Sequence, residues 1–360
     1  MERRGFLKNA GLASAAVAGP LLVTEKAQAA KKVHWKMVTT WPKNFPGLGT
    51  GANNLAKLIE QMSNGRITVK VYGAGELVPA FEVFDTVSRG KAEMGHGAAY
   101  YWKGKDETFQ FFSTVPFGFN AAEMNAWLYH GGGMELWREA YDKFGLIPMA
   151  AGNTTVQMAG WFNKEIKSLA DLNGLKMRIP GLGGEVLQRA GGTPVNLPGG
   201  ELFTSLKSGA IDATEWVGPY NDLAFGLYKA AKYYYYPGWH EPGTTLECVV
   251  NKEAFNKLPK DLQSIVLHAS RIVNQDMAAE YTARNNASLQ VLLNKHKVNL
   301  RRLPDDVISE LKKISKDVVS DLAKKDAFAK KVYQSFESFR NDVTAWHDIA
   351  ERSYLNARQS

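Results

Sequence analysis

The residue best placed to bind a ligand is Arg178, in a predicted strand at 175–179 just before a glycine-rich turn. That turn, residues 181–184, leads into a predicted helix that opens at Glu185. In α/β folds, ligands bind where a strand ends beside a helix N-terminus, and the free N–H groups there favour negative charge. A guanidinium at that point can hold a carboxylate through two parallel hydrogen bonds. The competing interpretation of Arg178 is a surface ion pair.

Three side chains elsewhere carry the oxygen ligands that a hard cation such as Na⁺ or Ca²⁺ prefers. Gln157 lies in a polar and aromatic run at 153–162, which is unusual for a plain strand. Glu215 precedes Trp216 at the end of a predicted strand, and Glu241 ends a similar Gly-Trp-His-Glu run. Composition does not show whether these three side chains lie close together in the fold. An isolated glutamate is more often a solvated surface group.

Patterns typical of catalysis are incomplete in this chain. Residues 130–133, His-Gly-Gly-Gly, resemble the oxyanion loop of some esterases, but no serine lies in G-x-S-x-G. Residues 181–184 do not complete G-x-G-x-x-G, and no phosphate-binding G-x-x-x-x-G-K-[ST] is present. The seven histidines form no zinc-binding pair. The single cysteine, Cys248, is expected to be a buried strand residue. We therefore expect no enzyme, and an exported esterase stays as an alternative.

The elements that must position these residues alternate between strands and helices. Strands are predicted at 33–38 and 67–72, and helices at 53–63 and 80–89. A second unit begins near Ile147. It has a predicted helical turn at 168–173, strands at 175–179 and 211–216, and short helices at 185–190 and 202–207. This order predicts an α/β fold with helices packed on mostly parallel sheets.

The C-terminal third is predicted to be helical. A helix begins near Asp261 and runs well past Tyr281. The last segment repeats apolar residues at spacings of four and three, in a stripe formed by Phe328, Val332, Phe336, Phe339, Val343, Trp346 and Ile349. Such a stripe must pack on its own core or on another subunit.

Residues 1–29 have the features of a cleaved signal peptide. Paired arginines at positions 3 and 4 precede an uncharged stretch at 10–23, and Ala27-Gln28-Ala29 supplies a cleavage site. The stretch is too short to cross a hydrocarbon core of ~30 Å. The pattern R-R-x-F-L-K resembles a twin-arginine signal, so we expect a periplasmic protein, with an ordinary Sec signal as the alternative.

The charges do not indicate a nucleic-acid partner. The chain has 44 basic and 36 acidic residues, a formal net charge of +8, and the excess is spread along its length. No later apolar run reaches about 18 residues, which predicts a soluble mature protein.

Several linked motifs resemble one family. Residues 171–178 match the D-L-x-G-x-K-x-R signature of the DctP-type solute receptors of tripartite ATP-independent periplasmic (TRAP) transporters, and 208–213 match their later G-x-I-D-A/G element. Further segments resemble the TakP-like α-keto acid/lactate-binding branch, namely residues 100–106, 153–158, 212–220 and 233–239. The resemblance covers the whole chain.

The resemblance implies an α/β, two-lobed periplasmic binding protein fold with a long C-terminal helix. Residues 30–153 plus about 242–285 would form lobe I, and 154–241 plus about 286–325 would form lobe II. Residues 326–360 would form the C-terminal helix and a dimerisation element. The implied partners are a small carboxylate ligand, TRAP membrane subunits and a second copy of the chain.

The resemblance also implies the ligand and its contacts. The ligand would be a 2-oxo or 2-hydroxy monocarboxylate, such as pyruvate, another 2-oxo acid or lactate, bound with a metal cation (Na⁺ or Ca²⁺). Arg178 would bind the carboxylate, and Asn153, Tyr100, Tyr101 and Trp216 would help to fix it. The cation would be held by Gln157, Glu215, the Trp216 carbonyl and Glu241. Ala98-Ala99 depart from the bulkier residues expected there, which leaves the acid open, and a sugar acid or dicarboxylate remains the alternative ligand.

Overall fold

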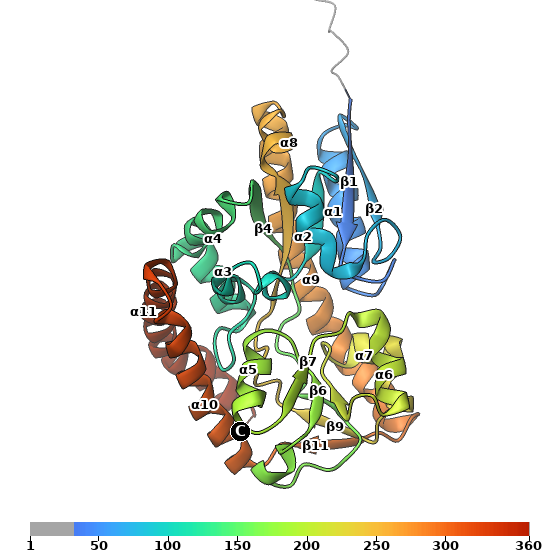
Figure 1. The fold of residues 1–360 in the computed structure, drawn as a ribbon, viewed down its shortest axis with the longest axis vertical. Coiled ribbons are helices and arrows are strands. Elements are labelled where there is room, and N and C mark those ends of the chain that lie inside the picture. Colours follow the sequence, from blue (N-terminus) through green and yellow to red (C-terminus); the bar gives the residue numbers. More distant parts are fainter. Residues whose placement is uncertain (1–31, 360) are drawn as a thin grey trace, which may run out of the picture. The chain divides into compact units, whose positions relative to one another are not determined.

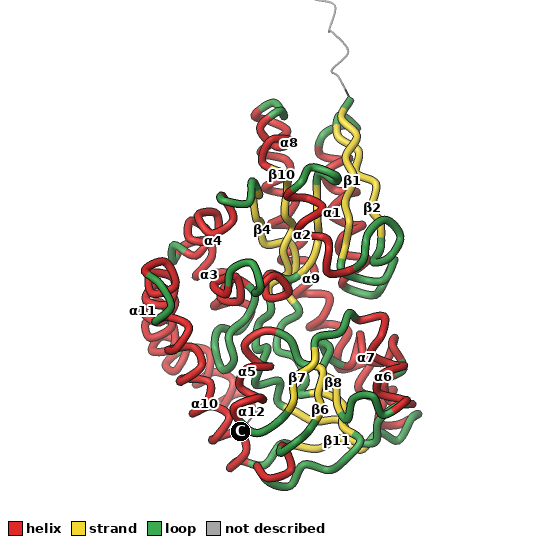
Figure 2. The backbone as a smooth tube through the Cα atoms, viewed as in Figure 1, coloured by secondary structure: helices red, strands yellow, loops and turns green. Residues whose placement is uncertain are grey.

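The computed structural model describes residues 32–359, so the predicted signal peptide at residues 1–29 lies outside the described part of the chain. Its strands form two sheets (Figures 1 and 2). The first has the strand order β2-β1-β3-β10-β4. These strands are β1 (Val33–Thr39), β2 (Ile67–Tyr72), β3 (Met94–Gly97), β4 (Leu146–Asn153) and β10 (Thr245–Asn251).

The second sheet has the order β11-β9-β5-β8-β6-β7. Its strands are β5 (Gly160–Phe162), β6 (Lys176–Arg178), β7 (Thr193–Val195), β8 (Ala213–Thr214), β9 (Tyr233–Tyr236) and β11 (Asn299–Arg302). The chain therefore passes from the first sheet to the second after β4, returns after β9, and passes to the second sheet again after β10.

Both sheets mix parallel and antiparallel pairs. In the first, β1 is parallel to β2 and β3, whereas β10 is antiparallel to β3 and β4. In the second, β6 is parallel to β7 and β8, whereas β5 is antiparallel to β8 and β9. Strand β11 is also parallel to β9. Among the described strands, only β5 and β10 run opposite to the other strands of their sheets, so the α/β class and the expectation of mostly parallel sheets are both confirmed.

Helices surround the strands in Figure 2. They are α1 (Leu48–Met62), α2 (Val83–Ser88), α3 (Ala121–His130), α4 (Gly133–Asp142), α5 (Gly181–Arg189), α6 (Leu202–Ser208), α7 (Pro219–Phe225), α8 (Lys252–Asn256), α9 (Lys260–Asn294), α10 (Asp305–Ala323), α11 (Ala327–Ile349) and α12 (Glu351–Gln359). Short 3₁₀ turns join them, including η2 (Ala99–Trp102) and η3 (Glu107–Phe112).

Two predicted boundaries are wrong near the candidate site. Helix α5 begins at Gly181 and not at Glu185. The glycines form the first turn of the helix, and Gly184 permits its close approach to the preceding strand, because a Cβ there would lie 2.7 Å from the carbonyl oxygen of Ile179. Strand β8 covers only Ala213 and Thr214, so the residues after it are free to turn toward β6.

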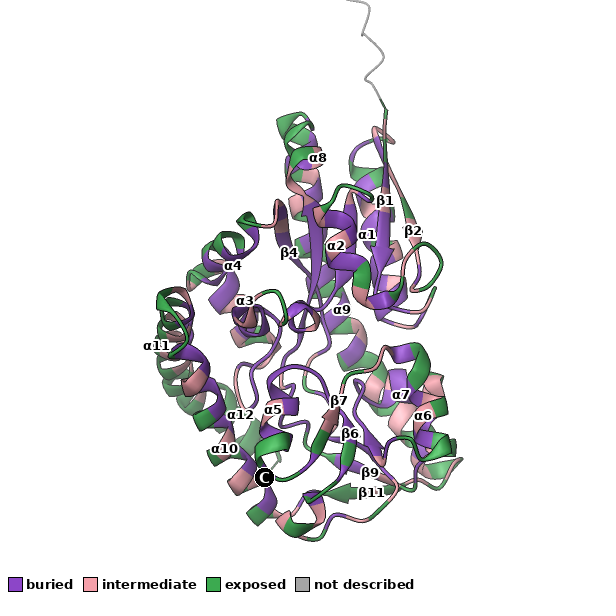
Figure 3. Ribbon diagram, viewed as in Figure 1, coloured by how far each residue is buried: buried purple, intermediate pink, exposed green. Residues whose placement is uncertain are grey.

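The C-terminal stripe divides into a buried and an exposed half. Val332 and Phe336 are buried, and the Phe336 ring lies 4.3 Å from that of Phe119. Farther along α11, Trp346 and Ile349 are 62% and 74% exposed. Figure 3 shows α11 with both buried and exposed surfaces. The stripe therefore packs on the core of its own chain at one end only.

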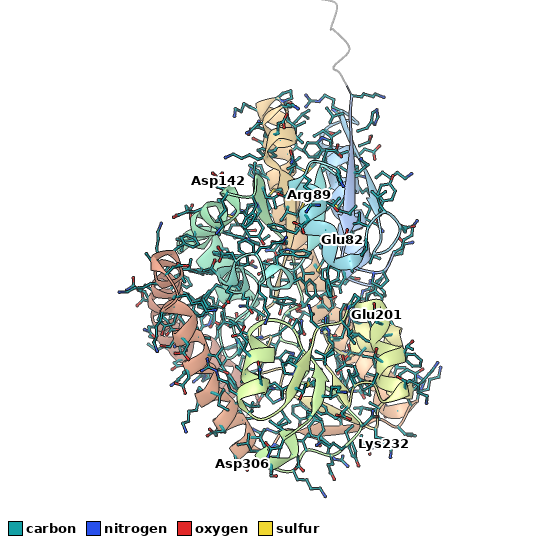
Figure 4. All side chains as sticks on the ribbon, viewed as in Figure 1. Glu82, Arg89, Asp142, Glu201, Lys232 and Asp306 are labelled. Atoms are coloured by element: carbon teal, nitrogen blue, oxygen red, sulfur yellow. The ribbon has the colours of Figure 1, made fainter. Side chains whose placement is uncertain are left out.

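Charged side chains of both signs point outward around the fold. Figure 4 labels six of them, all exposed, which are Glu82, Arg89, Asp142, Glu201, Lys232 and Asp306. Within residues 32–359, no helix is both long and apolar enough to cross a membrane.

Candidate functional site

Arg178, the last residue of β6, is buried with only 1% of its surface exposed. Its Nε donates to the Leu197 carbonyl at 3.0 Å, and its Nη2 donates to the Tyr101 hydroxyl at 3.2 Å. Its Nη1 donates to Oε1 of Glu215, which is also fully buried. The alternative of a surface ion pair is therefore wrong.

Sheet register places the carboxylate of Glu215 beside this guanidinium. Thr214, the last residue of β8, pairs with Arg178 in the parallel β6–β8 ladder. The backbone N–H of Glu215, the next residue, donates to the Arg178 carbonyl at 3.2 Å. The Trp216 ring follows, with its centroid 5.1 Å from Cζ of Arg178. Trp216 and Trp41 meet edge to face at 6.2 Å, so aromatic rings cover this side of the site.

Gln157 and Glu241 lie on the two loops by which the chain passes between the sheets. The Gln157 N–H donates to the Glu241 carbonyl at 3.1 Å, and its Nε2 donates to Oε2 of Glu241 at 2.8 Å. Gly238 permits this approach, because a Cβ there would lie 2.1 Å from the Gln157 carbonyl oxygen. Residues that are 84 positions apart in sequence are thereby fixed as neighbours.

The oxygen atoms of this cluster are not all satisfied. In the part of the chain that the structure describes, Gln157 Oε1 and Glu215 Oε2 are buried without a hydrogen-bond partner. Burial, followed by the nearby charge of Glu215, raises the pKa of the Glu241 carboxyl well above its usual range. Two buried carboxyl groups thus lie near one guanidinium, which donates to Glu215. A hard cation fits this site because it would neutralise the second carboxylate and bind the unpartnered oxygens.

Tyr100 and Tyr101 reach the site from η2. Tyr101 accepts the hydrogen bond from Arg178, and its ring lies 6.2 Å from that of Trp41. Tyr100 lies beside the start of α5, where a Cβ at Gly181 would come within 3.2 Å of its Cβ. Burial raises the pKa of both phenols, so both hydroxyl groups stay protonated at neutral pH and can donate a hydrogen bond.

Asn153, also expected at the site, has protein partners at both ends of its amide. Its Nδ2 donates to the Gly243 carbonyl at 3.0 Å, and its Oδ1 accepts from the Thr155 N–H at 2.8 Å. Thr155 has a positive φ of 59°, so the Asn153 side chain supports a strained turn that leads to Gln157. A direct contact between Asn153 and a ligand stays a prediction.

Sequence reasoning missed His240, which is buried beside the acidic pair. Its Nε2 lies 3.5 Å from Oε2 of Glu215. Ligand atoms of Glu215, His240 and Glu241 all lie within 4.8 Å of one another. Its position next to Glu241 in the run Gly-Trp-His-Glu could have identified it as a site residue. No second histidine lies at the spacing of a metal-binding pair.

The glycines that suggested an esterase loop have a packing role. A Cβ at Gly131 would lie 2.7 Å from the Phe339 ring, and a Cβ at Gly133 would lie 2.8 Å from the Trp127 ring. These residues let α11 approach the α3–α4 corner closely, and His130 at the end of α3 is exposed.

The chain is similar to known solute-binding proteins. The model of the DctP family, described as bacterial extracellular solute-binding protein, family 7, matches residues 37–326. The chain is 45% identical over 364 residues to the monocarboxylate 2-oxoacid-binding periplasmic protein of Nostoc sp., with 100% of both chains covered.

Solved structures show the same fold. A TRAP periplasmic solute binding protein from Pseudoalteromonas atlantica T6c, with bound sodium and pyruvate, is 44% identical with a TM-score of 0.88 over 91% of this chain and 99% of that one. A TRAP solute binding protein from Bordetella bronchiseptica RB50 is 36% identical with a TM-score of 0.89 over 91% and 97%. That protein is a mixed-occupancy dimer with calcium and picolinate in one active site and an apo site in the other. These likenesses confirm the predicted two-lobed fold with a long C-terminal helix.

Proposed function

Since the chain belongs to the bacterial extracellular solute-binding proteins of family 7, we propose that it is the extracytoplasmic receptor of a TRAP transporter for a 2-oxo or 2-hydroxy monocarboxylate. Pyruvate, another 2-oxo acid or lactate would bind together with a metal cation. The receptor would then release the acid chemically unchanged to the membrane subunits.

One observation carries this proposal, namely the buried guanidinium of Arg178 next to an oxygen-rich cluster with unpartnered atoms. In the described part of the chain, the unpartnered oxygens are Oε1 of Gln157 and Oε2 of Glu215. A 2-oxo acid offers one carboxylate oxygen and its 2-oxygen to a single cation, which an unsubstituted acid cannot do. The cation would therefore select for the 2-substituent, and Arg178 would select for the carboxylate.

The charges support the joint binding of anion and cation. Arg178 with Glu215 and Glu241 has a net charge of −1 when both carboxyl groups are ionised, and in that state the site repels an organic anion that binds without a cation. A divalent cation restores neutrality with the anion bound. With a monovalent cation, neutrality requires that Glu241 keep its proton, which its raised pKa favours.

Each residue of the candidate site then has a defined role. Gln157, Glu215, Glu241 and the Trp216 carbonyl would hold the cation, which when bound supplies the positive charge that chelates the acid. Arg178 would orient the carboxylate, and Tyr100 and Tyr101 would donate hydrogen bonds to it. The Trp41 and Trp216 rings would exclude water from the ion pairs, which strengthens them.

Export, lobes and assembly complete the proposal. We propose that residues 1–29 direct export to the periplasm by the twin-arginine route. The lobes would follow the two sheets, with the borders predicted from the sequence. The exposed half of α11, with Trp346 and Ile349, would bind a second copy of the chain, because exposed apolar patches mark protein interfaces.

A thermal-shift panel tests the ligand class. A ligand at 100 times its Kd stabilises the folded state by about 2.7 kcal/mol. Pyruvate, 2-oxobutyrate or lactate should raise Tm in the presence of Ca²⁺ or Na⁺. Propionate, which lacks the 2-oxygen, should not raise it at the same concentration. Equal shifts with propionate, or none with any of these acids, would reject the proposed ligand class.

A further inference from the structure

The His240 imidazole is buried in the candidate site with no committed hydrogen bond. Its side chain is 1% exposed, and both ring nitrogens lack a hydrogen-bond partner among residues 32–359. A buried imidazole usually donates a hydrogen bond from one nitrogen and accepts one at the other. Burying both nitrogens without a partner destabilises the folded state. The ring therefore requires a partner that the protein itself does not provide.

In the described structure, a carboxylate oxygen beside this ring also lacks a hydrogen-bond partner. Oε2 of Glu215 lies 3.5 Å from Nε2 of His240, and within the described residues it too has no hydrogen-bond partner. Gln157 Oε1 is a third atom of this kind in the cluster. Unpartnered ligand atoms on three different side chains thus gather in one buried place, and the nearest ligand atoms of Glu215, His240 and Glu241 lie within 4.8 Å of one another.

The separation of nitrogen and oxygen suits a shared metal ion. Two ligands bound to one transition metal at about 2.1 Å lie roughly 3.0–3.4 Å apart. The observed 3.5 Å between Nε2 and Oε2 exceeds this by very little, so small movements of the two side chains would suffice. Because Nδ1 is also uncommitted within the described chain, the ring can carry its proton there and present a lone pair at Nε2.

We propose that His240 Nε2 is a further ligand of the cation site, and that the site therefore binds borderline divalent ions such as Mn²⁺ or Co²⁺ more tightly than an all-oxygen site would. Imidazole is a poor ligand for Na⁺ and Ca²⁺ but a good one for first-row transition ions. The inference rests on the proposed function only in requiring that a cation binds at Glu215 and Glu241. It adds a nitrogen ligand and a preference among metals.

The packing around His240 favours a fixed ring position. A Cβ at Gly183 in α5 would lie 3.0 Å from the His240 Cβ, and the Trp239 ring centroid lies 5.4 Å from that of His240. The close contact of α5 with the His240 Cβ and the neighbouring Trp239 ring restrict the movement of the side chain. A metal ligand must be held in this way to discriminate between ions.

Pulsed electron paramagnetic resonance of the mature protein tests the proposal directly. The protein would be stripped of metal, loaded with Mn²⁺ and pyruvate, and examined for ¹⁴N coupling from a directly bound imidazole. We expect this coupling in the wild type and in His130→Gln, a matched control whose histidine is exposed at the end of α3. We expect its loss in His240→Gln, which places an amide at the same position.

Calorimetric titrations with Mn²⁺ and with Ca²⁺ supply the second readout. His240→Gln should lower Mn²⁺ affinity at least about tenfold more than it lowers Ca²⁺ affinity. Wild-type protein that binds Mn²⁺ without ¹⁴N coupling, or a variant that weakens both ions equally, would overturn the inference while leaving the proposed function intact. If pyruvate binding needs no cation at all, the cation-dependent part of the proposed function itself fails. The wild-type spectrum remains decisive even if the variant does not fold.

Discussion

Nη1 of Arg178 donates to Oε1 of Glu215 in a pair from which water is almost completely excluded. In the proposed function, a ligand carboxylate and Glu215 would therefore compete for the same guanidinium, and a cation and Arg178 would compete for the same carboxylate. Binding of both ligands would resolve this competition by an exchange of partners, because the cation would bind Glu215 and the acid would bind Arg178. We infer that this exchange couples the affinity for the acid to that for the cation.

Arg178→Lys should weaken pyruvate binding by about 2 kcal/mol or more, because a lysine cannot make two parallel hydrogen bonds to a carboxylate. Titration calorimetry at fixed Ca²⁺ gives the measurement. The matched control is Arg189→Lys, at an exposed arginine of α5 that pairs with Asp321 at 2.8 Å. Unchanged affinity in Arg178→Lys would show that the guanidinium does not bind the carboxylate.

Glu215→Gln should lower Ca²⁺ affinity at least about tenfold, because it removes a buried negative charge while keeping the size of the side chain. Equilibrium dialysis with ⁴⁵Ca²⁺ measures the effect. Glu247→Gln provides the control, since Glu247 is also a buried carboxyl but is held by Trp102 and Tyr141, outside the cation cluster. Similar Ca²⁺ affinities in the two variants would contradict the assigned cation site.

Glu247 should also make stability depend on pH. Burial raises the pKa of its carboxyl from 4.5 to about 7, and burial likewise raises that of Asp222 from 3.8 to about 7. At pH values between the ordinary pKa of each carboxyl and its raised pKa in the folded state, the folded state binds more protons than the unfolded state. The free energy of unfolding therefore falls as pH rises from about 5 to 7. Each such group contributes about 1.4 kcal/mol per pH unit within this window.

Glu247→Gln should therefore reduce the slope of unfolding free energy against pH by about 1.4 kcal/mol per pH unit between about pH 5 and 7. Urea denaturation of cation-free protein at several pH values measures it, and the contribution of Asp222 should remain. A variant slope equal to that of the wild type would show that Glu247 is ionised across the window.

The double substitution Trp346→Ser and Ile349→Ser should convert a dimer into a monomer, because it removes the most exposed large apolar side chains of α11. Analytical ultracentrifugation gives the mass. Ile272→Ser, at a 47% exposed isoleucine of α9, is the control and should leave the mass unchanged. A wild-type monomer at high concentration would remove this part of the proposal.

Local patterns predicted most elements but not their limits. The alternation at 33–38 and the apolar spacing at 328–349 correspond to β1 and α11. The start of α5 was predicted too late, because its glycines were interpreted as a turn when they serve to bring the helix close to Ile179. Strands β5 and β10 run antiparallel to their neighbours, and local periodicity does not predict this reversal.

The site could be predicted only in part, for a similar reason. Arg178 was identifiable from its place at a strand end before a helix. The residues alone did not bring Gln157, Glu215 and Glu241 together, because their proximity depends on the β6–β8 register and on two crossing loops that meet at Gly238. His240 was missed because a single histidine has no distinguishing spacing, and only burial beside Glu215 reveals it.

Calorimetric titration of pyruvate into metal-stripped protein, before and after replenishment with Ca²⁺, tests the central claim most directly. The partner exchange between Arg178 and Glu215 predicts weak or undetectable binding without a cation and at least about tenfold tighter binding with it, with the reciprocal gain in Ca²⁺ affinity when pyruvate is present. Equal pyruvate affinity with and without the cation, also after replenishment with Na⁺, would contradict the account.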